Sequence, residues 1–199
     1  MRTFRSLLVC PLVALAVAVV PRDGSVPAGP WTAGVWKIAQ GTDVFFYGDA
    51  INASEGKFWI NKNTTAACPT DVDGLDCSAY SGSDTVFAGG NNTLSLNVAV
   101  PGGQQVYIAK DGSLSCTAPH SGALPEGAVA SGFSRLRSEV FGAPVNLYNS
   151  GRYWYICPIG NGAVREIPYQ LFLTTDKEGC YYTQVRTYQA EGVSAWEYS

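Results

Sequence analysis

Short stretches in which apolar and polar residues alternate dominate the chain after Pro30. Between Thr93 and Val100, apolar residues alternate with polar ones, as expected for a strand with one buried face. Other short runs are rich in the β-branched and aromatic residues that favour strands. The predicted strands are Val35–Ala39, Val44–Tyr47, Lys57–Asn61, Asp84–Ala88, Thr93–Val100, Gln104–Ala109, Val145–Tyr148, Arg152–Ile156, Tyr169–Thr174 and Tyr181–Thr187.

Glycine, proline and aspartate mark the predicted connections between these strands. Gly89-Gly90 and Pro101-Gly102-Gly103 are predicted to be breaks between strands, and Asp111-Gly112 to form a tight hairpin. The stretch from Ser121 to Ser138 is irregular, and we expect a long loop there with one short strand. Outside the N-terminal region, no twelve-residue window carries a helical stripe of apolar residues.

These patterns predict an all-β fold class, with a single antiparallel domain over residues 31–199 built from about ten short strands. A β-sandwich is the simplest arrangement, because two packed sheets bury one face of each strand and leave few long open edges. A β-trefoil and a closed barrel are the alternatives, because periodicity alone does not separate these architectures.

The N-terminal region has the pattern of a secretory signal peptide. Arg2 and Arg5 precede an uncharged run of fifteen residues, from Ser6 to Val20. As a helix this run would be about 22 Å long, which is too short for the roughly 30 Å core of a bilayer. Ala16-Val17-Ala18 supplies a cleavage site, so residues 1–18 are predicted to be removed and residues 19–30 to form a flexible leader. The mature product is expected to be secreted, either to the extracellular space or to a cell wall.

Five cysteines follow the predicted signal peptide, and in an oxidising compartment they are expected to form disulfides. Cys68 and Cys77 flank a turn rich in Pro, Asp and Gly, so we predict that they pair. Cys157 and Cys180 are predicted to pair because each lies at the end of a strand-like run. Cys116 is left over, either as a buried free thiol or as a sign that the pairing differs.

Three Asn-x-Ser/Thr sequons, at Asn52, Asn63 and Asn91, lie in turn-like contexts. One such sequon is weak evidence, because chance matches are common. Three sequons behind a signal peptide predict N-glycosylated surface loops and passage through a eukaryotic secretory pathway.

The charge of the chain excludes several partners. Without Arg2 and Arg5 the chain has 11 basic and 16 acidic residues, a net charge of −5. An acidic chain that lacks any Lys/Arg cluster is a poor candidate for binding nucleic acid or an anionic membrane. No second apolar span follows the signal peptide, so no membrane association is expected after cleavage.

The residue types offer little for catalysis, for a metal or for a cofactor, so we predict a protein that is not an enzyme. His120 is the one histidine, and no nucleophile or acid can be assigned to it. The acidic turn from Asp71 to Asp76 resembles a calcium loop, but an EF-hand would need Gly at Asp76 and Glu at Gly82. A solvated turn is the simpler interpretation. Most acids lie in turns, whereas a glycoside hydrolase needs two carboxylates on one face.

The densest aromatic cluster is Tyr153-Trp154-Tyr155, a candidate platform for stacking on sugar rings. On a strand, Tyr153 and Tyr155 share one face and Trp154 takes the other. The alternative is that one of these faces is core and the other is ordinary sheet surface.

Several short motifs, taken in their order along the chain, resemble the PhiA-like family of fungal cell wall proteins, which includes secreted IgE-binding allergens. The motifs are Gly34-Val35-Trp36-Lys37-Ile38, the sequon at Asn63 just before Cys68, Gln104-Gln105-Val106-Tyr107-Ile108-Ala109-Lys110-Asp111-Gly112, Tyr153-Trp154-Tyr155-Ile156-Cys157-Pro158 and Glu178-Gly179-Cys180. The resemblance spans about Gly34 to Thr187. It implies a secreted protein in or near the fungal cell wall, with no catalytic residues to carry over, and it supports the Cys157–Cys180 pair.

The sequence therefore predicts a secreted, non-enzymatic glycoprotein of the fungal cell wall with a structural or interaction role, whose partners are wall polysaccharide or other wall proteins. One alternative is a carbohydrate-binding or hydrolysing protein that acts on wall polysaccharide. A secreted effector directed at a host is another. Saturable binding to chitin or β-glucan separates the carbohydrate-binding alternative from mere residence in the wall.

Overall fold

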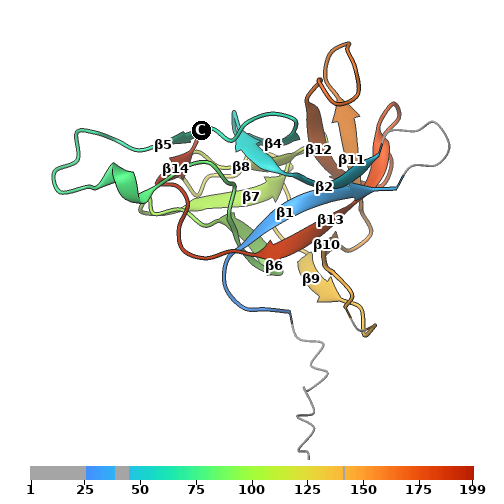
Figure 1. The fold of residues 1–199 in the computed structure, drawn as a ribbon, viewed down its shortest axis with the longest axis horizontal. Helices are drawn as coiled ribbons and strands as arrows, with labels where there is room; N and C mark the ends of the chain where they lie inside the picture. The colour runs from blue at the N-terminus through green and yellow to red at the C-terminus, as the bar shows by residue number, and fades with distance from the viewer. Residues whose placement is uncertain (1–25, 39–44, 141) are drawn as a thin grey trace, which may run out of the picture.

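The computed structural model describes residues 26–38, 45–140 and 142–199, and the regular secondary structure of these residues is almost entirely β-strand (Figure 1). They contain fourteen strands and one 3-10 helix, η1 (Cys77–Ala79). The predicted signal peptide and residues 19–25 of the predicted leader lie outside the described residues. The strands are β1 (Trp31–Lys37), β2 (Phe46–Ala50), β3 (Asn52–Ser54), β4 (Lys57–Ile60), β5 (Ala66–Ala67), β6 (Phe87–Leu96), β7 (Gln104–Ile108), β8 (Leu114–Cys116), β9 (Phe133–Arg137), β10 (Val145–Asn149), β11 (Tyr153–Pro158), β12 (Tyr169–Thr174), β13 (Tyr181–Gln189) and β14 (Glu197–Tyr198).

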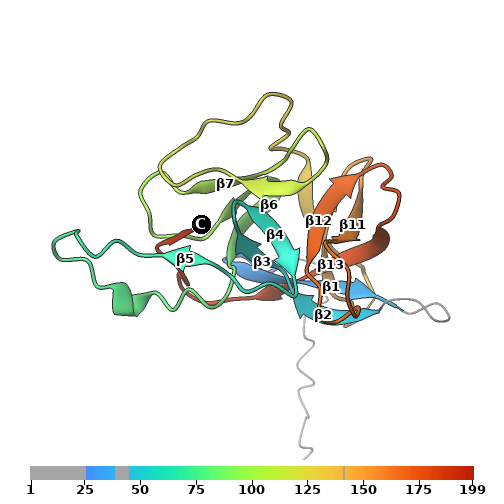
Figure 2. The same cartoon turned by 90° about the horizontal axis from the view of Figure 1, so that it is seen from above.

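Nine of these strands close into an antiparallel barrel (Figure 2). Around the barrel the order is β10-β9-β6-β7-β8-β4-β12-β11-β13, and β13 returns to β10 through the pairs Val145–Thr187 and Asn146–Arg186. The all-β prediction is therefore confirmed. The sandwich is wrong, and the closed barrel that stood as its alternative is the architecture found. Closure gives β10 a second partner in β13, which removes the open edge that β10 would otherwise present.

The barrel interior is filled by the inward-facing residues of the nine wall strands and of β1. Trp31 on β1 is fully buried, stacks on Phe87 at a centroid distance of 4.8 Å, and donates its indole N–H to the carbonyl of Gly89. Phe58 stacks on Phe87 from β4 at 5.4 Å. Such rings bury large apolar areas, so this stack contributes much of the hydrophobic stabilisation of the core.

The remaining strands lie against the barrel. β1 pairs with β13 along six residue pairs, and β2 pairs with β1. β3 extends β4, and β5 pairs with β14 in a separate two-stranded sheet. The loop between β5 and β6, which carries η1, projects away from the barrel (Figures 1 and 2).

Strand β6 corrects the predicted break at Gly89-Gly90. β6 continues through both glycines, which adopt positive φ angles of 85° and 96°. A Cβ on Gly90 would lie 2.6 Å from the side chain of Arg135, and one on Gly89 would lie 2.7 Å from the carbonyl oxygen of Thr93. Glycine therefore lets the strand kink at this point and lets Arg135 pack against the backbone.

The described part of the predicted leader is attached to the barrel. The carbonyl of Pro27 accepts a hydrogen bond from the guanidinium of Arg135, and the carbonyl of Ala28 accepts one from Gln189. The carbonyl of Pro30 accepts the backbone N–H of Ala190. Three contacts thus hold residues 27–30 against β9 and the end of β13.

Both predicted disulfides are present, with Cys68 bonded to Cys77 and Cys157 bonded to Cys180. The β11–β13 ladder ends at the pair Ile156–Tyr181. In that register the next cross-strand pair is Cys157–Cys180. The second disulfide therefore links β11 to the residue just before β13, directly beside the last pair of the ladder. The first disulfide instead closes the projecting loop outside the barrel.

We predict that the two disulfides differ in their effect on barrel stability. Replacing Cys157 and Cys180 together by serine is expected to lower the free energy of unfolding by about 3 kcal/mol, because the bond limits the unfolded chain and ties two wall strands. The matched replacement of Cys68 and Cys77 should loosen the projecting loop and lower the barrel's free energy of unfolding by clearly less. Urea denaturation followed by tryptophan fluorescence measures both values. Equal losses in the two double variants would contradict the prediction.

Candidate functional site

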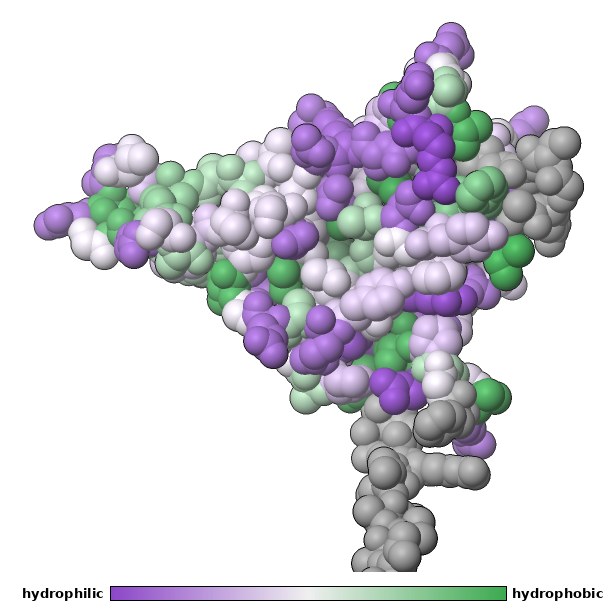
Figure 3. All heavy atoms as spheres, in the orientation of Figure 1, coloured by the Kyte–Doolittle hydropathy of each residue, from purple (hydrophilic) through white to green (hydrophobic). Residues whose placement is uncertain are grey.

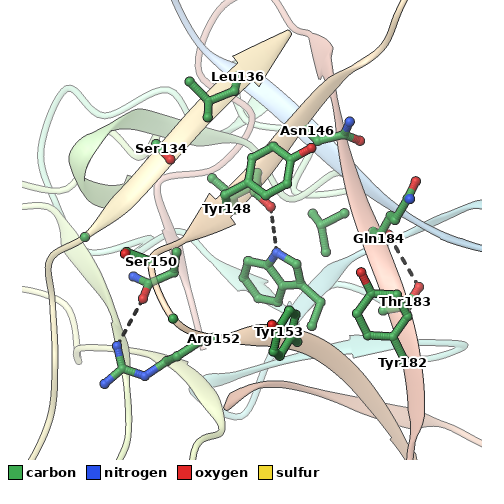
Figure 4. Close-up of a pocket in the computed structure, with 16 residues that line it drawn as sticks. Ser134, Leu136, Asn146, Tyr148, Ser150, Arg152, Tyr153, Tyr182, Thr183 and Gln184 are labelled. Atoms are coloured by element: carbon green, nitrogen blue, oxygen red, sulfur yellow. Dashed lines mark hydrogen bonds between the residues drawn. The ribbon is translucent and has the colours of Figure 1, made fainter. Parts of the chain in front are cut away.

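A groove opens on the outer surface where the barrel wall splits. β10 pairs with β13 only at Val145 and Asn146, and beyond them β11 takes the place of β10 beside β13, starting at Trp154. The wedge between the three strands holds a groove of about 550 Å³ (Figure 4). We name it the tyrosine groove. It is lined by Gly132, Ser134, Leu136, Asn146, Leu147, Tyr148, Asn149, Ser150, Gly151, Arg152, Tyr153, Trp154, Tyr182, Thr183, Gln184 and Val185.

Trp154 closes the bottom of this wedge. Its side chain is only 5% exposed, and its indole N–H donates to the carbonyl of Leu147 across 2.6 Å. Leu147 has no strand partner on β13, so the indole supplies a hydrogen-bond donor where the sheet supplies none. An unmade bond to a buried carbonyl costs about 1–3 kcal/mol, so Trp154 allows the wall to open without that penalty.

The rim of the groove is made of tyrosine rings. Tyr153 and Tyr182 are 54% and 55% exposed, and their rings meet edge to face at a centroid distance of 6.1 Å. Tyr155 meets Tyr182 in the same manner at 6.2 Å. Tyr148 stands on the opposite side of the wedge on β10 and is also exposed (Figure 4).

The predicted stacking residues separate as strand alternation requires. Tyr153 and Tyr155 lie on the outer face, whereas Trp154 packs into the hydrophobic core. Trp154 is therefore wrong as a stacking residue, because its ring faces are covered. Sequence analysis missed Tyr148 and Tyr182, which lie on other strands. Alternation places each of them outward, but only the strand pairing brings them to Tyr153.

The polar groups between the rings are amides, hydroxyls and one guanidinium. Asn146 and Gln184 project from β10 and β13 towards the groove (Figure 4). Arg152 donates to the side-chain oxygen of Asn149 at 3.0 Å, which fixes the tight turn between β10 and β11. None of the described residues that line the groove is acidic. Such a surface suits a ligand that offers both apolar faces and many hydroxyl groups.

A second, smaller cleft of about 440 Å³ lies on the other side of β13. We name it the arginine cleft, since Arg186 forms part of its wall. It shares Tyr182, Thr183 and Gln184 with the tyrosine groove. It is lined by Trp36, Lys37, Ile38, Cys180, Tyr181, Tyr182, Thr183, Gln184 and Arg186.

The outer face of β1 and β13 is not a plain hydrophobic patch. In Figure 3 it is covered mainly by pale residues of intermediate hydropathy, interrupted by purple polar patches and only scattered green ones. Tyrosine and tryptophan, which combine an apolar ring with a polar tip, give this intermediate character. The described residues include no helix with the length and apolar character needed to cross a bilayer.

The other candidate residues lie apart from both clefts. His120 is exposed in the loop between β8 and β9, with a φ angle of 58° and no hydrogen bond to another described residue. The turn from Asp71 to Asp76 lies in the projecting loop, where Asp76 caps η1. The carboxylate of Asp76 accepts hydrogen bonds from the backbone and hydroxyl of Ser78, and these bonds lower its pKa.

The three sequons differ in accessibility. Asn63 and Asn91 are exposed. Asn52 is half-buried in β3, and its side-chain nitrogen donates to the carbonyl of Lys62 at 2.7 Å. Ser54, the third residue of that sequon, is fully buried. A glycan on Asn52 would occupy space that the folded chain fills.

Cys116 is a buried free thiol on β8, the first of the two possibilities left open by the sequence. Burial raises its pKa to about 12. The thiol therefore stays protonated and unreactive in the folded protein at neutral pH.

We predict that the secreted protein carries glycans on Asn63 and Asn91 and none on Asn52. The reason is the half-buried position of Asn52 and the hydrogen bond that its amide makes. Enzymatic deglycosylation in ¹⁸O water, followed by peptide mass spectrometry, identifies each occupied asparagine. An ¹⁸O label on most Asn52 peptides would show that this sequon is accepted despite its burial.

The thiol of Cys116 also predicts a pH dependence of stability. In the unfolded chain a cysteine has a pKa of about 8.5, so above that pH the unfolded state loses a proton that the folded state keeps. The free energy of unfolding should thus be unaffected below about pH 8 and fall as pH rises, by about 2 kcal/mol at pH 10 from this group. Urea denaturation at several pH values between 7 and 10 measures the free energy of unfolding. This free energy should fall less steeply with pH in Cys116→Ala than in the parent protein. Parallel curves would contradict the assignment.

Comparison with curated proteins finds a relative in a fungus. The chain is 33% identical over 126 residues to an "Uncharacterized secreted protein" of the fungus Arthroderma benhamiae, a match that covers 63% of this chain and 58% of that protein. The chain thus matches less than two thirds of the length of this curated relative. No family model matches the chain, so membership of the PhiA-like family stays a prediction that rests on the motifs. No solved structure matches. The chain is similar to a secreted fungal protein.

Proposed function

We propose that this chain is a secreted, non-catalytic glycoprotein of the fungal cell wall that binds wall polysaccharide through the tyrosine groove. The observation that carries the proposal is the composition of the groove, where exposed tyrosine rings surround amide and hydroxyl groups and no described lining residue is acidic. The proposal unites the interaction role predicted from the sequence with carbohydrate binding, its alternative.

The chemistry of a pyranose ring fits this groove. The axial and ring C–H groups of a sugar present an apolar face that packs against an aromatic ring. Its hydroxyls donate and accept at once, as does the amide of Gln184. The volume of about 550 Å³ lies within the range of ordinary ligand sites.

The same composition favours binding over turnover. Hydrolysis of a glycosidic bond needs two carboxyl groups, one on each side of the bond. The described residues around the tyrosine groove offer tyrosines, amides, hydroxyls and Arg152, and none of these replaces the pair of acids. A protein with this groove would hold a polysaccharide without cleaving it.

Secretion to the wall is supported by independent features. The relative from Arthroderma benhamiae is named as a secreted protein. The two disulfides of this chain need an oxidising compartment, and the sequons at Asn63 and Asn91 are exposed. The PhiA-like motifs point to the wall itself.

The proposal predicts saturable binding that depends on the groove tyrosines. The mature glycoprotein should sediment with insoluble fungal wall material, and a panel with purified chitin and β-glucan would show which polymer it binds. Tyr182→Ala should weaken binding about tenfold or more, because stacking on one ring contributes on the order of 1–2 kcal/mol.

Tyr80→Ala is the matched control. Tyr80 is a tyrosine of the projecting loop and lines neither the tyrosine groove nor the arginine cleft. Its replacement should leave binding nearly unchanged. Wall binding that survives in Tyr182→Ala and in Tyr153→Ala, or a complete lack of binding in the parent protein, would overturn the proposal.

A further inference from the structure

The guanidinium of Arg186 is the least satisfied charged group on this face. It makes no hydrogen bond or ion pair with any described residue, and its Nε is buried without a partner. By contrast, Arg165 pairs with Asp49 at 2.8 Å, and Arg152 donates to Asn149. An arginine has five N–H donors in a planar fork, and because the Nε–H of Arg186 is buried, the donors that can meet a ligand are the four N–H groups of its two terminal nitrogens.

Stacking holds this guanidinium in place. Its carbon lies 3.8 Å from the ring centroid of Trp36, a cation–π contact. The indole N–H of Trp36 donates to the hydroxyl of Tyr188, and Tyr47 meets Trp36 edge to face at 5.8 Å. These contacts come from three neighbouring strands, β1, β2 and β13. The side chain that presents the charge is therefore fixed by its neighbours before any ligand arrives.

The charge around both clefts opposes the charge of the whole chain. The chain carries more acidic than basic residues, 16 against 13. Yet the described residues that line the tyrosine groove and the arginine cleft include Arg152 and Arg186 and no carboxylate. A local excess of positive charge on an acidic protein attracts an anionic group to this face.

The two clefts are neighbours on either side of β13. Tyr182, Thr183 and Gln184 of β13 line both, and the register places Gln184 opposite Trp36 on β1. Adjacent strands lie about 4.8 Å apart, so one linear chain can cross β13 and contact both clefts. A ligand whose rings stack in the tyrosine groove would bring its next units over Arg186.

We propose that the arginine cleft is a second subsite, which recognises an anionic substituent, a carboxylate or a phosphate, on the glycan bound in the tyrosine groove. This inference rests on the proposed function and names its ligand class, an acidic linear glycan. The planar fork of Arg186 matches the two oxygens of either anion. A lysine side chain in the same place would offer a point charge without the planar fork, so Arg186→Lys separates geometry from charge.

Isothermal titration with matched oligosaccharides tests the subsite on the full mature glycoprotein. One pair of probes is an oligogalacturonate and its neutral methyl ester, and another is a phosphorylated mannan oligosaccharide and its dephosphorylated form. At least one anionic probe should bind about tenfold more tightly than its neutral partner, and the pair that shows the gain identifies the anion. In Arg186→Gln the anionic probe should bind no more tightly than its neutral partner, while binding of the neutral probe persists. In Arg186→Lys the preference for the anionic probe should be partly kept.

Arg137→Gln is the control for net charge. Arg137 is an exposed arginine of β9 that lines neither cleft, so its replacement removes the same charge and should preserve the gain. Near-ultraviolet circular dichroism shows that each variant is folded. Equal affinity for charged and neutral probes, together with loss of both in Tyr182→Ala, would overturn the arginine subsite and leave the proposed function intact. The arginine subsite would also be overturned if Arg137→Gln reduced the preference for the anionic probe as much as Arg186→Gln does. If the protein bound none of the probes and no wall polymer, both proposals would be overturned.

Discussion

The pairing of β10 with β13 is the contact on which the rest of this structure depends. It consists of two residue pairs, Val145–Thr187 and Asn146–Arg186, and it turns a long sheet into a closed barrel. The hydroxyl of Thr187 reinforces it by donating to the carbonyl of Val145. Because the pairing stops after two residues, the wall opens immediately beyond it. The closure of the barrel and the groove in its wall thus both follow from this short ladder. The indole N–H of Trp154 donates to the carbonyl of Leu147, which the opening leaves without a partner on β13.

β13 links the core to the outer surface through its alternation. Val185 is buried in the core, whereas Gln184 and Arg186 on either side of it face the two clefts. The same strand pairs with β1, β10 and β11. A single strand therefore fixes the spacing between the tyrosine groove and the arginine cleft, and the core that orders the strand also orders both clefts.

The parts of this protein that sequence analysis predicted well are local. The strand Tyr169–Thr174 was predicted with the bounds found, and both disulfides were predicted because their cysteines bracket a turn or end strands. Barrel closure was not predictable, because it depends on which distant strands pair and not on the pattern within any strand. The groove was not predictable for the same reason. Tyr153 was recognised from the sequence, but the ring that it meets belongs to Tyr182 on another strand, and only strand pairing brings the two together. Gly89-Gly90 misled because glycine marks a kink inside a strand as readily as a break between two.

Arg186 is easier to explain by recognition than by stability. Its buried Nε lacks a partner, and an unsatisfied buried donor costs about 1–3 kcal/mol. The stack on Trp36 offsets this only in part, because a partly exposed cation–π contact contributes about 0.5–1 kcal/mol. A neutral side chain at this outer position of β13 would remove the unsatisfied donor and keep the strand pairing. The guanidinium is therefore a small thermodynamic burden on the free protein, and an anionic ligand that accepts hydrogen bonds from its terminal N–H groups would offset that burden.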